Sequence, residues 1–272
     1  PLLLGGFSLS HAICTLGLHH ALAFAALTAL ISLACEAVGV ATGALYGAYH
    51  YADLPGPRLF DVPLAVPMAW FMVIYPSYTL ANTLVDRRVV SRPRPGLGRL
   101  IGLAALSALL MTAWDLVLDP QMVEAGHWVW HASGEYFGIP AQNFVGWLAT
   151  TLAIYLAYRA LEAGWSPRPK GAASPAFERL PMIIYALLAS GYTVGYTLLG
   201  RPALAIIALF AMGTPCLAVH CCGEPVRAGF RPRACGPGRI RPGPFSTDDP
   251  LAEVLGGSQM LTRWFLRQVA RL

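Results

Sequence analysis

The sequence predicts an all-α protein, a polytopic transmembrane helix bundle of about six to seven spans. Two observations predict this class. Hydrophobic residues make up 56% of the 272 residues and charged residues only 12%, whereas soluble domains carry about a quarter charged residues. The apolar residues also gather in runs long enough to cross roughly 30 Å of hydrocarbon as helices.

The longer runs cover residues 21–40, 62–84, 100–118, 144–161, 180–199 and 202–219, and a shorter run covers residues 2–18. Pro67 and Pro76 fall inside the second of the longer runs. Proline is tolerated in a membrane helix because neighbouring helices can satisfy the freed backbone groups. We therefore expect neither proline to end that span.

The runs predict two parts, a transmembrane domain over residues 1–220 and a tail over residues 221–272. The tail is rich in glycine, proline and arginine, so we expect it to be disordered. Its last part, residues 251–272, has the pattern of a short amphipathic helix on the membrane surface. No basic stretch precedes the first apolar run, so no signal peptide is indicated, and because the chain starts at Pro1 we expect the natural protein to begin earlier.

The net charge of +5 does not indicate a nucleic-acid partner, because the basic residues lie in connections and the tail rather than on one helix face. The positive-inside rule makes the arginine-rich loops 86–99 and 159–179 and the C-terminal tail cytoplasmic. We expect an integral protein of the cell (plasma) membrane. Alternation of the spans then places residues 39–61, 119–140 and 200–201 on the opposite side, where half of the 14 acidic residues gather.

Three of those acidic residues lie at membrane depth. Asp115 and Asp119 are four residues apart in one span, so they share a helix face. Glu36 lies near the end of another span that emerges on the same side. A carboxyl group in the membrane is costly and is a functional candidate by default, although Asp119 precedes Pro120 and could simply end its helix.

A desolvated carboxyl group can keep its proton and act as an acid. Protonation of a trisubstituted isoprenoid double bond makes a tertiary carbocation, which aromatic faces stabilise by cation–π attraction. We therefore predict Asp115, Asp119 and Glu36 as catalytic residues. The predicted substrate-binding residues are Trp114, Trp128, Trp130, Tyr136, Phe137, Asn143 and Trp147.

Each of these groups has a simpler interpretation. Tryptophan and tyrosine gather at membrane interfaces whatever the function. Asn143 could cap the helix that follows it or hold a water molecule.

No metal or cofactor is predicted. His127 and His131 are spaced to share a helix face and could join His50 around a metal, but the histidine clusters of membrane di-iron oxygenases are missing. The chain also has no GxGxxG fingerprint and no phosphate-binding P-loop.

Three blocks carry a resemblance to a known family. They read WDLVLDPQM, GHWVW and GEYFGIPAQNFVGW within residues 114–147, CEAVGVATGALYGAYHYAD at residues 35–53, and VPLAVPMAWFMVIYPSY at residues 62–78. Over about residues 7–219 the chain resembles the integral-membrane carotenoid biosynthesis proteins of the CruF type, the carotenoid 1′,2′-hydratases, which include bacterioruberin-pathway hydratases. In that family the second block usually reads EWLGV, so Ala37 stands where tryptophan is usual.

The resemblance implies a hydro-lyase that adds water to the terminal double bond of an acyclic carotenoid without a redox cofactor. It implies a lycopene-like or γ-carotene-like substrate, water, the lipid bilayer and other carotenoid-pathway enzymes as partners. One aspartate would be the general acid, and the other carboxylate or Glu36 would position or deprotonate the water. Which carboxylate does which task stays open.

Three other functions compete. A membrane prenyltransferase would use the DLVLD motif to hold magnesium diphosphate, but that face is poor in arginine. An isoprenoid cyclase would use the same acid-generated cation and consume no water. A non-enzymatic carotenoid-binding or transport protein would also carry acidic residues at membrane depth.

Overall fold

The computed structural model describes residues 2–52, 56–90, 95–165 and 174–221. The predicted disordered tail, apart from Cys221, and the predicted amphipathic helix at residues 251–272 lie outside these described residues.

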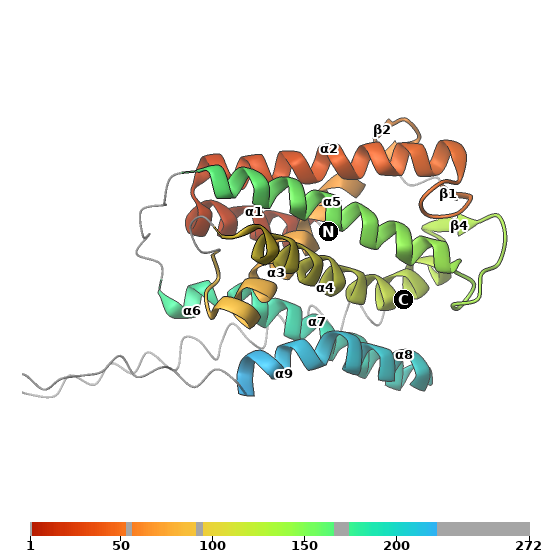
Figure 1. Cartoon of the computed structure of the whole chain (residues 1–272). Coiled ribbons are helices and arrows are strands. Elements are labelled where there is room, and N and C mark those ends of the chain that lie inside the picture. The colour runs from red at the N-terminus through yellow and green to blue at the C-terminus, as the bar shows by residue number, and fades with distance from the viewer. Residues whose placement is uncertain (1, 53–55, 91–94, 166–173, 222–272) are drawn as a thin grey trace, which may run out of the picture. The chain divides into compact units, whose positions relative to one another are not determined.

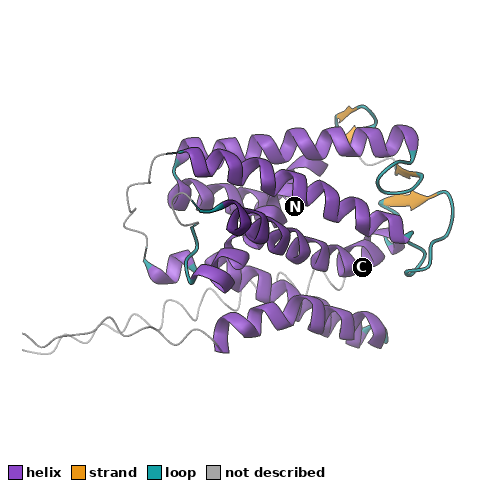
Figure 2. Cartoon of the chain, in the orientation of Figure 1, coloured by secondary structure: helices purple, strands orange, loops and turns teal. Residues whose placement is uncertain are grey.

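All the predicted apolar runs form helices, so the helical bundle is confirmed (Figures 1 and 2). The helices are α1 (Leu2–Leu16), α2 (Leu18–Thr42), α3 (Ala65–Asp86), α4 (Leu97–Glu124), α5 (Ala141–Gly164), the short α6 (Pro175–Glu178), α7 (Leu180–Leu198), α8 (Pro202–Ile207) and α9 (Thr214–Cys221). A π-helical segment, η1 (Ala208–Gly213), joins α8 to α9.

Within the described residues, five helical segments are long and apolar enough to cross a membrane: α2, α4, α5, α7 and the continuous α8–η1–α9 helix. α1 has 15 residues and spans only about 22 Å. α3 is long enough but more polar, and it is buried almost continuously from Trp70 to Asn82. α3 also contacts α1, α2, α4, α7 and α9. Because protein surrounds α3 from Trp70 to Asn82, the tyrosine, serine and threonine side chains of that stretch can be accommodated there.

Prolines do not end the helices that contain them. Pro76 lies inside α3, as predicted. Pro120 lies inside α4, which continues to Glu124, so the interpretation that Asp119 ends its helix is wrong. Both helices are enclosed by neighbours, which can satisfy the backbone groups that proline leaves free.

The connections contain short strands, which differ from the all-helical prediction. β1 (Tyr49–Tyr51) pairs antiparallel with β4 (Trp128–Trp130), and β2 (Arg58–Leu59) pairs with β3 (Val62–Pro63). Since β4 lies between His127 and His131, these histidines do not share a helix face. The alternation of β1 points Tyr49 and Tyr51 inward and His50 outward.

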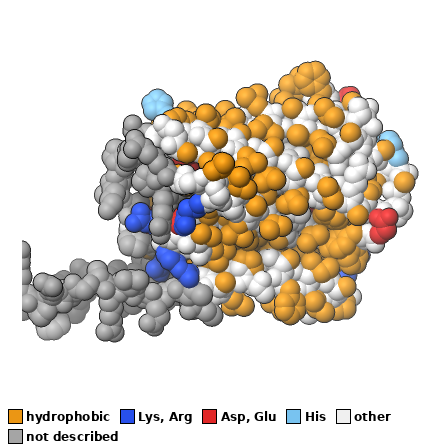
Figure 3. Space-filling view, in the orientation of Figure 1, with side chains coloured by type: hydrophobic (Ala, Val, Ile, Leu, Met, Phe, Trp, Pro, Cys, Tyr) orange, Lys and Arg blue, Asp and Glu red, His pale blue; other side chains and the backbone are white. Residues whose placement is uncertain are grey.

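The connections that the alternation of the spans predicts on one side of the membrane lie together in the structure. The β1–β4 pairing holds the 39–61 and 119–140 connections together at one end of the helices, and an exposed Arg201–Glu124 ion pair adds the connection at 200–201. At the other end of the helices, Arg99 pairs with Asp86 across the connection 86–99, and Arg159 of α5 donates to Asn82 of α3 and Ser107 of α4. Figure 3 shows hydrophobic side chains over the middle of the visible face, between blue arginines at one end and red acidic groups at the other.

Two glycines let the chain after α2 dock between helices. A Cβ at Gly146 of α5 would lie 2.3 Å from the carbonyl oxygen of Leu45, and a Cβ at Gly39 of α2 would lie 2.6 Å from the ring of Tyr46. Both distances are shorter than real contacts allow. The missing side chains therefore permit the segment that carries Tyr46 to sit between α2 and α5 and to lead into β1.

Candidate active site

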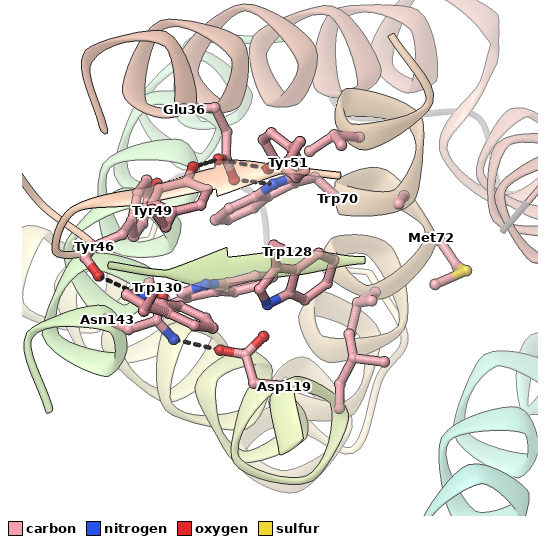
Figure 4. A pocket seen from close by; sticks show the side chains of 15 residues that line it. Glu36, Tyr46, Tyr49, Tyr51, Trp70, Met72, Asp119, Trp128, Trp130 and Asn143 are labelled. Atoms are coloured by element: carbon pink, nitrogen blue, oxygen red, sulfur yellow. Dashed lines mark hydrogen bonds between the residues drawn. The ribbon is translucent and has the colours of Figure 1, made fainter. Parts of the chain in front are cut away.

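A cavity of about 90 Å³ lies where α2, α3, α4 and α5 meet β1 and β4. Its polar lining consists of Glu36, Asp119, Asn143 and the tyrosines Tyr46, Tyr49 and Tyr51. Its apolar lining consists of Val66, Ala69, Trp70, Met72, Val73, Leu118, Trp128, Trp130 and Trp147. Figure 4 shows Glu36 on one side of the cavity and Asp119 on the other, with indole rings between them.

Glu36 is 4% exposed and accepts three hydrogen bonds. The hydroxyls of Tyr49 and Tyr51 donate to its Oε2, the latter at 2.8 Å, and the indole nitrogen of Trp70 donates to its Oε1 at 3.1 Å. Burial, and then the nearby Glu36 carboxyl, raise the pKa of both tyrosines above the usual value. Both phenols therefore stay protonated at ordinary pH and serve as donors to Glu36.

Asp115 and Asp119 share one carboxamide. The side-chain nitrogen of Asn143 donates to Oδ2 of Asp115 at 3.3 Å and to Oδ2 of Asp119. All three side chains are almost fully buried. Asn143 does not cap α5: the N-cap residue is Pro140, and the Asn143 side chain points inward to the aspartates. Asp119 lines the cavity, whereas Asp115 lies behind it and its Oδ1 has no hydrogen-bond partner among the described residues.

Indole rings cover the cavity between the carboxyl groups. Trp70 of α3 and Trp147 of α5 stack with ring centroids 4.2 Å apart and an interplanar angle of 13°. The β1–β4 register places Trp130 opposite Tyr49 and Trp128 opposite Tyr51. Such rings present electron-rich faces that attract a cation.

The predicted site residues divide into two groups. Glu36, Asp119, Asn143, Trp128, Trp130 and Trp147 line the cavity. The others lie around it. Trp114 is buried near Tyr192, Tyr136 donates to the carbonyl of Leu116, and Phe137 is 45% exposed.

Sequence reasoning missed Tyr46, Tyr49, Tyr51 and Trp70. The i, i+2 spacing of Tyr49 and Tyr51 is the signal that could have revealed them, because alternate residues of a strand face the same side. No comparable local signal marks Tyr46 or Trp70, whose places depend on how α2, α3 and α5 pack.

In the part of the chain that the structure describes, the histidines do not form a metal cluster. His50 and His131 approach each other at 3.2 Å on the exposed face of the β1–β4 pair. Among the described residues, no group of three or more histidine, cysteine, aspartate or glutamate side chains is placed to hold a metal ion. Cys216, His220, Cys221 and Cys222 form a second group of metal-ligand residue types in the sequence. Cys222 lies outside the described residues.

Comparison with known proteins places this chain among proteins of one pathway. Residues 2–215 match the family described as carotenoid biosynthesis protein. The chain belongs to that family. The predicted family resemblance is thereby confirmed, and the matched residues of the carotenoid biosynthesis family contain every residue of the cavity.

A relative within the curated proteins is the bisanhydrobacterioruberin hydratase of Haloarcula japonica. It is 38% identical over 128 residues, an alignment that covers 47% of this chain and 40% of the relative's length. No solved structure matches the chain.

Proposed function

We propose that this protein is a carotenoid hydratase, which adds water to the terminal double bond of an acyclic carotenoid end group. The observation that carries the proposal is the placement of Asp119 and Glu36 on opposite sides of one indole-lined cavity. The family and the hydratase relative support the substrate class and the reaction. Lycopene-like and γ-carotene-like molecules carry the required end group.

Asp119 is the proposed general acid, because it reaches the cavity and Asp115 does not. It gives its proton to carbon 2′ of the double bond, which leaves a tertiary cation at carbon 1′. The faces of Trp70, Trp147 and the β4 tryptophans stabilise that cation. Among the described residues, no cationic side chain lines the cavity to oppose it.

Glu36 is the proposed base. A water molecule bonds to carbon 1′ through its oxygen, and Glu36 accepts the proton that this water loses. The proton then returns to Asp119 before the next turnover, so the net change is one water added. The reaction needs no electron carrier because hydration brings no net oxidation or reduction.

Asp115 and Asn143 are proposed as positioning residues. Two carboxyl groups that share a single amide donor, with no cation among the cavity-lining residues, favour a shared proton over two negative charges. Asp115 and Asp119 therefore hold one proton between them, which Asp119 can present to the cavity, and Asn143 fixes the orientation of both groups.

We also propose the orientation and extent of the enzyme. Residues 1–220 form the hydratase domain, which lies in the plasma membrane. Loops 86–99 and 159–179 and the C-terminal tail face the cytoplasm. The positive-inside rule supports this orientation. The cavity then lies near the face of the membrane opposite the cytoplasm.

The test is expression in a bacterium that accumulates lycopene, followed by liquid chromatography and mass spectrometry of the pigments. We expect a product heavier by one water that takes its oxygen from labelled water and not from labelled dioxygen. Asp119→Asn protein that still inserts should give no such product. An unchanged mass with a shifted retention time would indicate cyclisation, and unchanged pigment with inserted protein would contradict the proposal.

A further inference from the structure

The cavity is small compared with the substrate class proposed above. A cavity of roughly 150 Å³ holds the six carbon atoms of one benzene ring, so about 90 Å³ holds only about four carbon atoms, such as a double bond with its methyl groups. The long polyene of a carotenoid does not fit inside. If the proposed function holds, the rest of the chain has to leave the cavity on one side.

The burial of the lining residues indicates where that side is. The polar groups Glu36, Asp119 and Asn143 are each 4% exposed or less. In contrast, Val66 and Ala69 of α3 and Leu118 of α4 line the same cavity and are partly exposed. The polar groups of the cavity are therefore closed off by protein. Trp128, Trp130 and Trp147 are partly exposed as well, but Trp128 and Trp130 belong to the β4 connection beyond the ends of the helices. Ala69 and Leu118 lie within α3 and α4, so they bring the apolar wall to the surface at the level of the membrane-spanning helices.

The surroundings of this wall are apolar as well. Met68, one residue before Ala69, is 51% exposed. Met72, at the α3 side of the cavity, lies away from Asn143 and Tyr46 in Figure 4. An apolar wall at the depth of membrane-spanning helices opens to lipid tails rather than to water.

We propose that the cavity binds only the terminal isoprene unit, and that the remainder of the substrate passes between Ala69 and Leu118 into the lipid. The proposal rests on the hydratase function and adds its substrate class: acyclic isoprenoids that carry the same end group, whatever their chain length. Ala69 and Leu118 are then the residues that leave room for the chain of a long substrate, which a short substrate does not need.

The experiment compares a long and a short substrate in membranes that contain the protein. Lycopene supplies the long chain and geraniol supplies the same end group on a short chain. Leu118→Trp and, from the facing helix, Ala69→Trp fill the proposed exit. Leu109→Trp is the matched control, because Leu109 is 56% exposed on the same helix and does not line the cavity.

Wild-type protein should hydrate both substrates. Because Ala69 and Leu118 also line the cavity, each exit variant should lower both rates. It should lower lycopene hydration at least about tenfold more than geraniol hydration, since only the long chain has to pass the filled space. Leu109→Trp should change neither rate. Two exit variants are used so that a loss of insertion in one does not remove the test.

Three results would overturn the proposal. Wild-type protein that hydrates lycopene but not geraniol would show that the chain beyond the end group is required. Equal loss on both substrates would make Ala69 and Leu118 part of the end-group site, and no loss on either would place the exit elsewhere. Wild-type protein that hydrates neither substrate would instead contradict the proposed function.

Discussion

At each end of the bundle, a buried asparagine forms hydrogen bonds with ionisable side chains, which are acidic at one end and basic at the other. Asn143, at the start of α5, donates to Asp115 and Asp119 beside the cavity. Asn82 accepts from the guanidinium of Arg159, which lies sixteen residues beyond Asn143 on α5, or about 24 Å along the helix.

The two ends differ in how the buried charge is satisfied. Arg159 is 2% exposed; it donates to Asn82, to Ser107 and to the carbonyl of Leu103, and lies over the ring of Tyr78. At the cavity end, three carboxyl groups gather, and none of the described residues that line the cavity is cationic. The comparison teaches that a buried charge surrounded by fixed partners stabilises packing, whereas one that borders a cavity is available for chemistry.

Asp119→Asn should lower the hydration activity more than any other change at the cavity end of the bundle. The amide keeps the size of the side chain but has no acidic proton, so we expect hydration to fall by about a thousandfold, the scale of general acid catalysis. Pigment analysis after expression in a lycopene-accumulating host measures this. Glu124→Gln, on the same helix but in an exposed ion pair, is the control and should change the rate less than about twofold. Activity retained in Asp119→Asn would remove Asp119 from the role of acid.

Variants of Asn82 and Asn143 test directly whether the two ends of the bundle differ in role. Asn82→Leu takes a hydrogen-bond acceptor from the charged Arg159, so the free energy of unfolding should fall by about 2–3 kcal/mol. The activity per inserted molecule should stay near wild type. Thermal unfolding in detergent and pigment yield per inserted protein measure the two effects.

Asn143→Leu is the matched counterpart at the cavity end. It should lower activity per inserted molecule by more than about tenfold because the two aspartates lose their common donor. The same two measurements apply. Equal losses of activity and of stability in the two asparagine variants would contradict the assignment of packing to the Arg159 end and of chemistry to the cavity end.

Gly146→Ala should disturb the cavity through the backbone. Its Cβ would meet the carbonyl of Leu45, so the segment that carries Tyr46 has to move, at a cost of about 2 kcal/mol. We expect a lower unfolding temperature together with reduced hydration. Gly195→Ala in α7 is the control: a Cβ there meets nothing within 4 Å, and alanine favours a helix. A neutral Gly146→Ala would show that this close approach is not required.

Tyr49→Phe should have the smallest effect. It removes one of three donors to Glu36 and leaves Tyr51 and Trp70 in place, so hydration should fall by about tenfold. The control is Tyr155→Phe, whose hydroxyl donates to the carbonyl of Ile74 away from the cavity. That variant should lose stability and keep its activity per inserted molecule, as measured by unfolding and pigment yield. Equal activities of the two variants would argue against a positioning role for Tyr49.

The helices could be predicted from sequence because lipid imposes a simple condition of length and apolarity. α3 shows the limit of that condition: protein encloses it, so its polar residues need not match lipid. The four-residue spacing of Asp115 and Asp119 was sufficient to predict a shared face.

Which residues line the cavity depends on how the helices pack, so it could not be predicted from the sequence. Tyr136 and Phe137 follow β4 closely in sequence but do not line the cavity, whereas Trp70, from a distant helix, does. Asp115 lies one helical turn before Asp119 on the same face of α4, and of the two only Asp119 lies at the level of the cavity. No periodicity in the sequence specifies either.

The pairing of β1 with β4 also has a consequence for biosynthesis. Tyr49, Tyr51 and Trp70 reach Glu36 from at most 34 residues away, whereas β4 and Asn143 emerge from the ribosome much later. Contacts distant in sequence form after local ones. We therefore expect the glutamate side to assemble as α2 and α3 enter the membrane, and the aspartate side to close over it only when α5 follows.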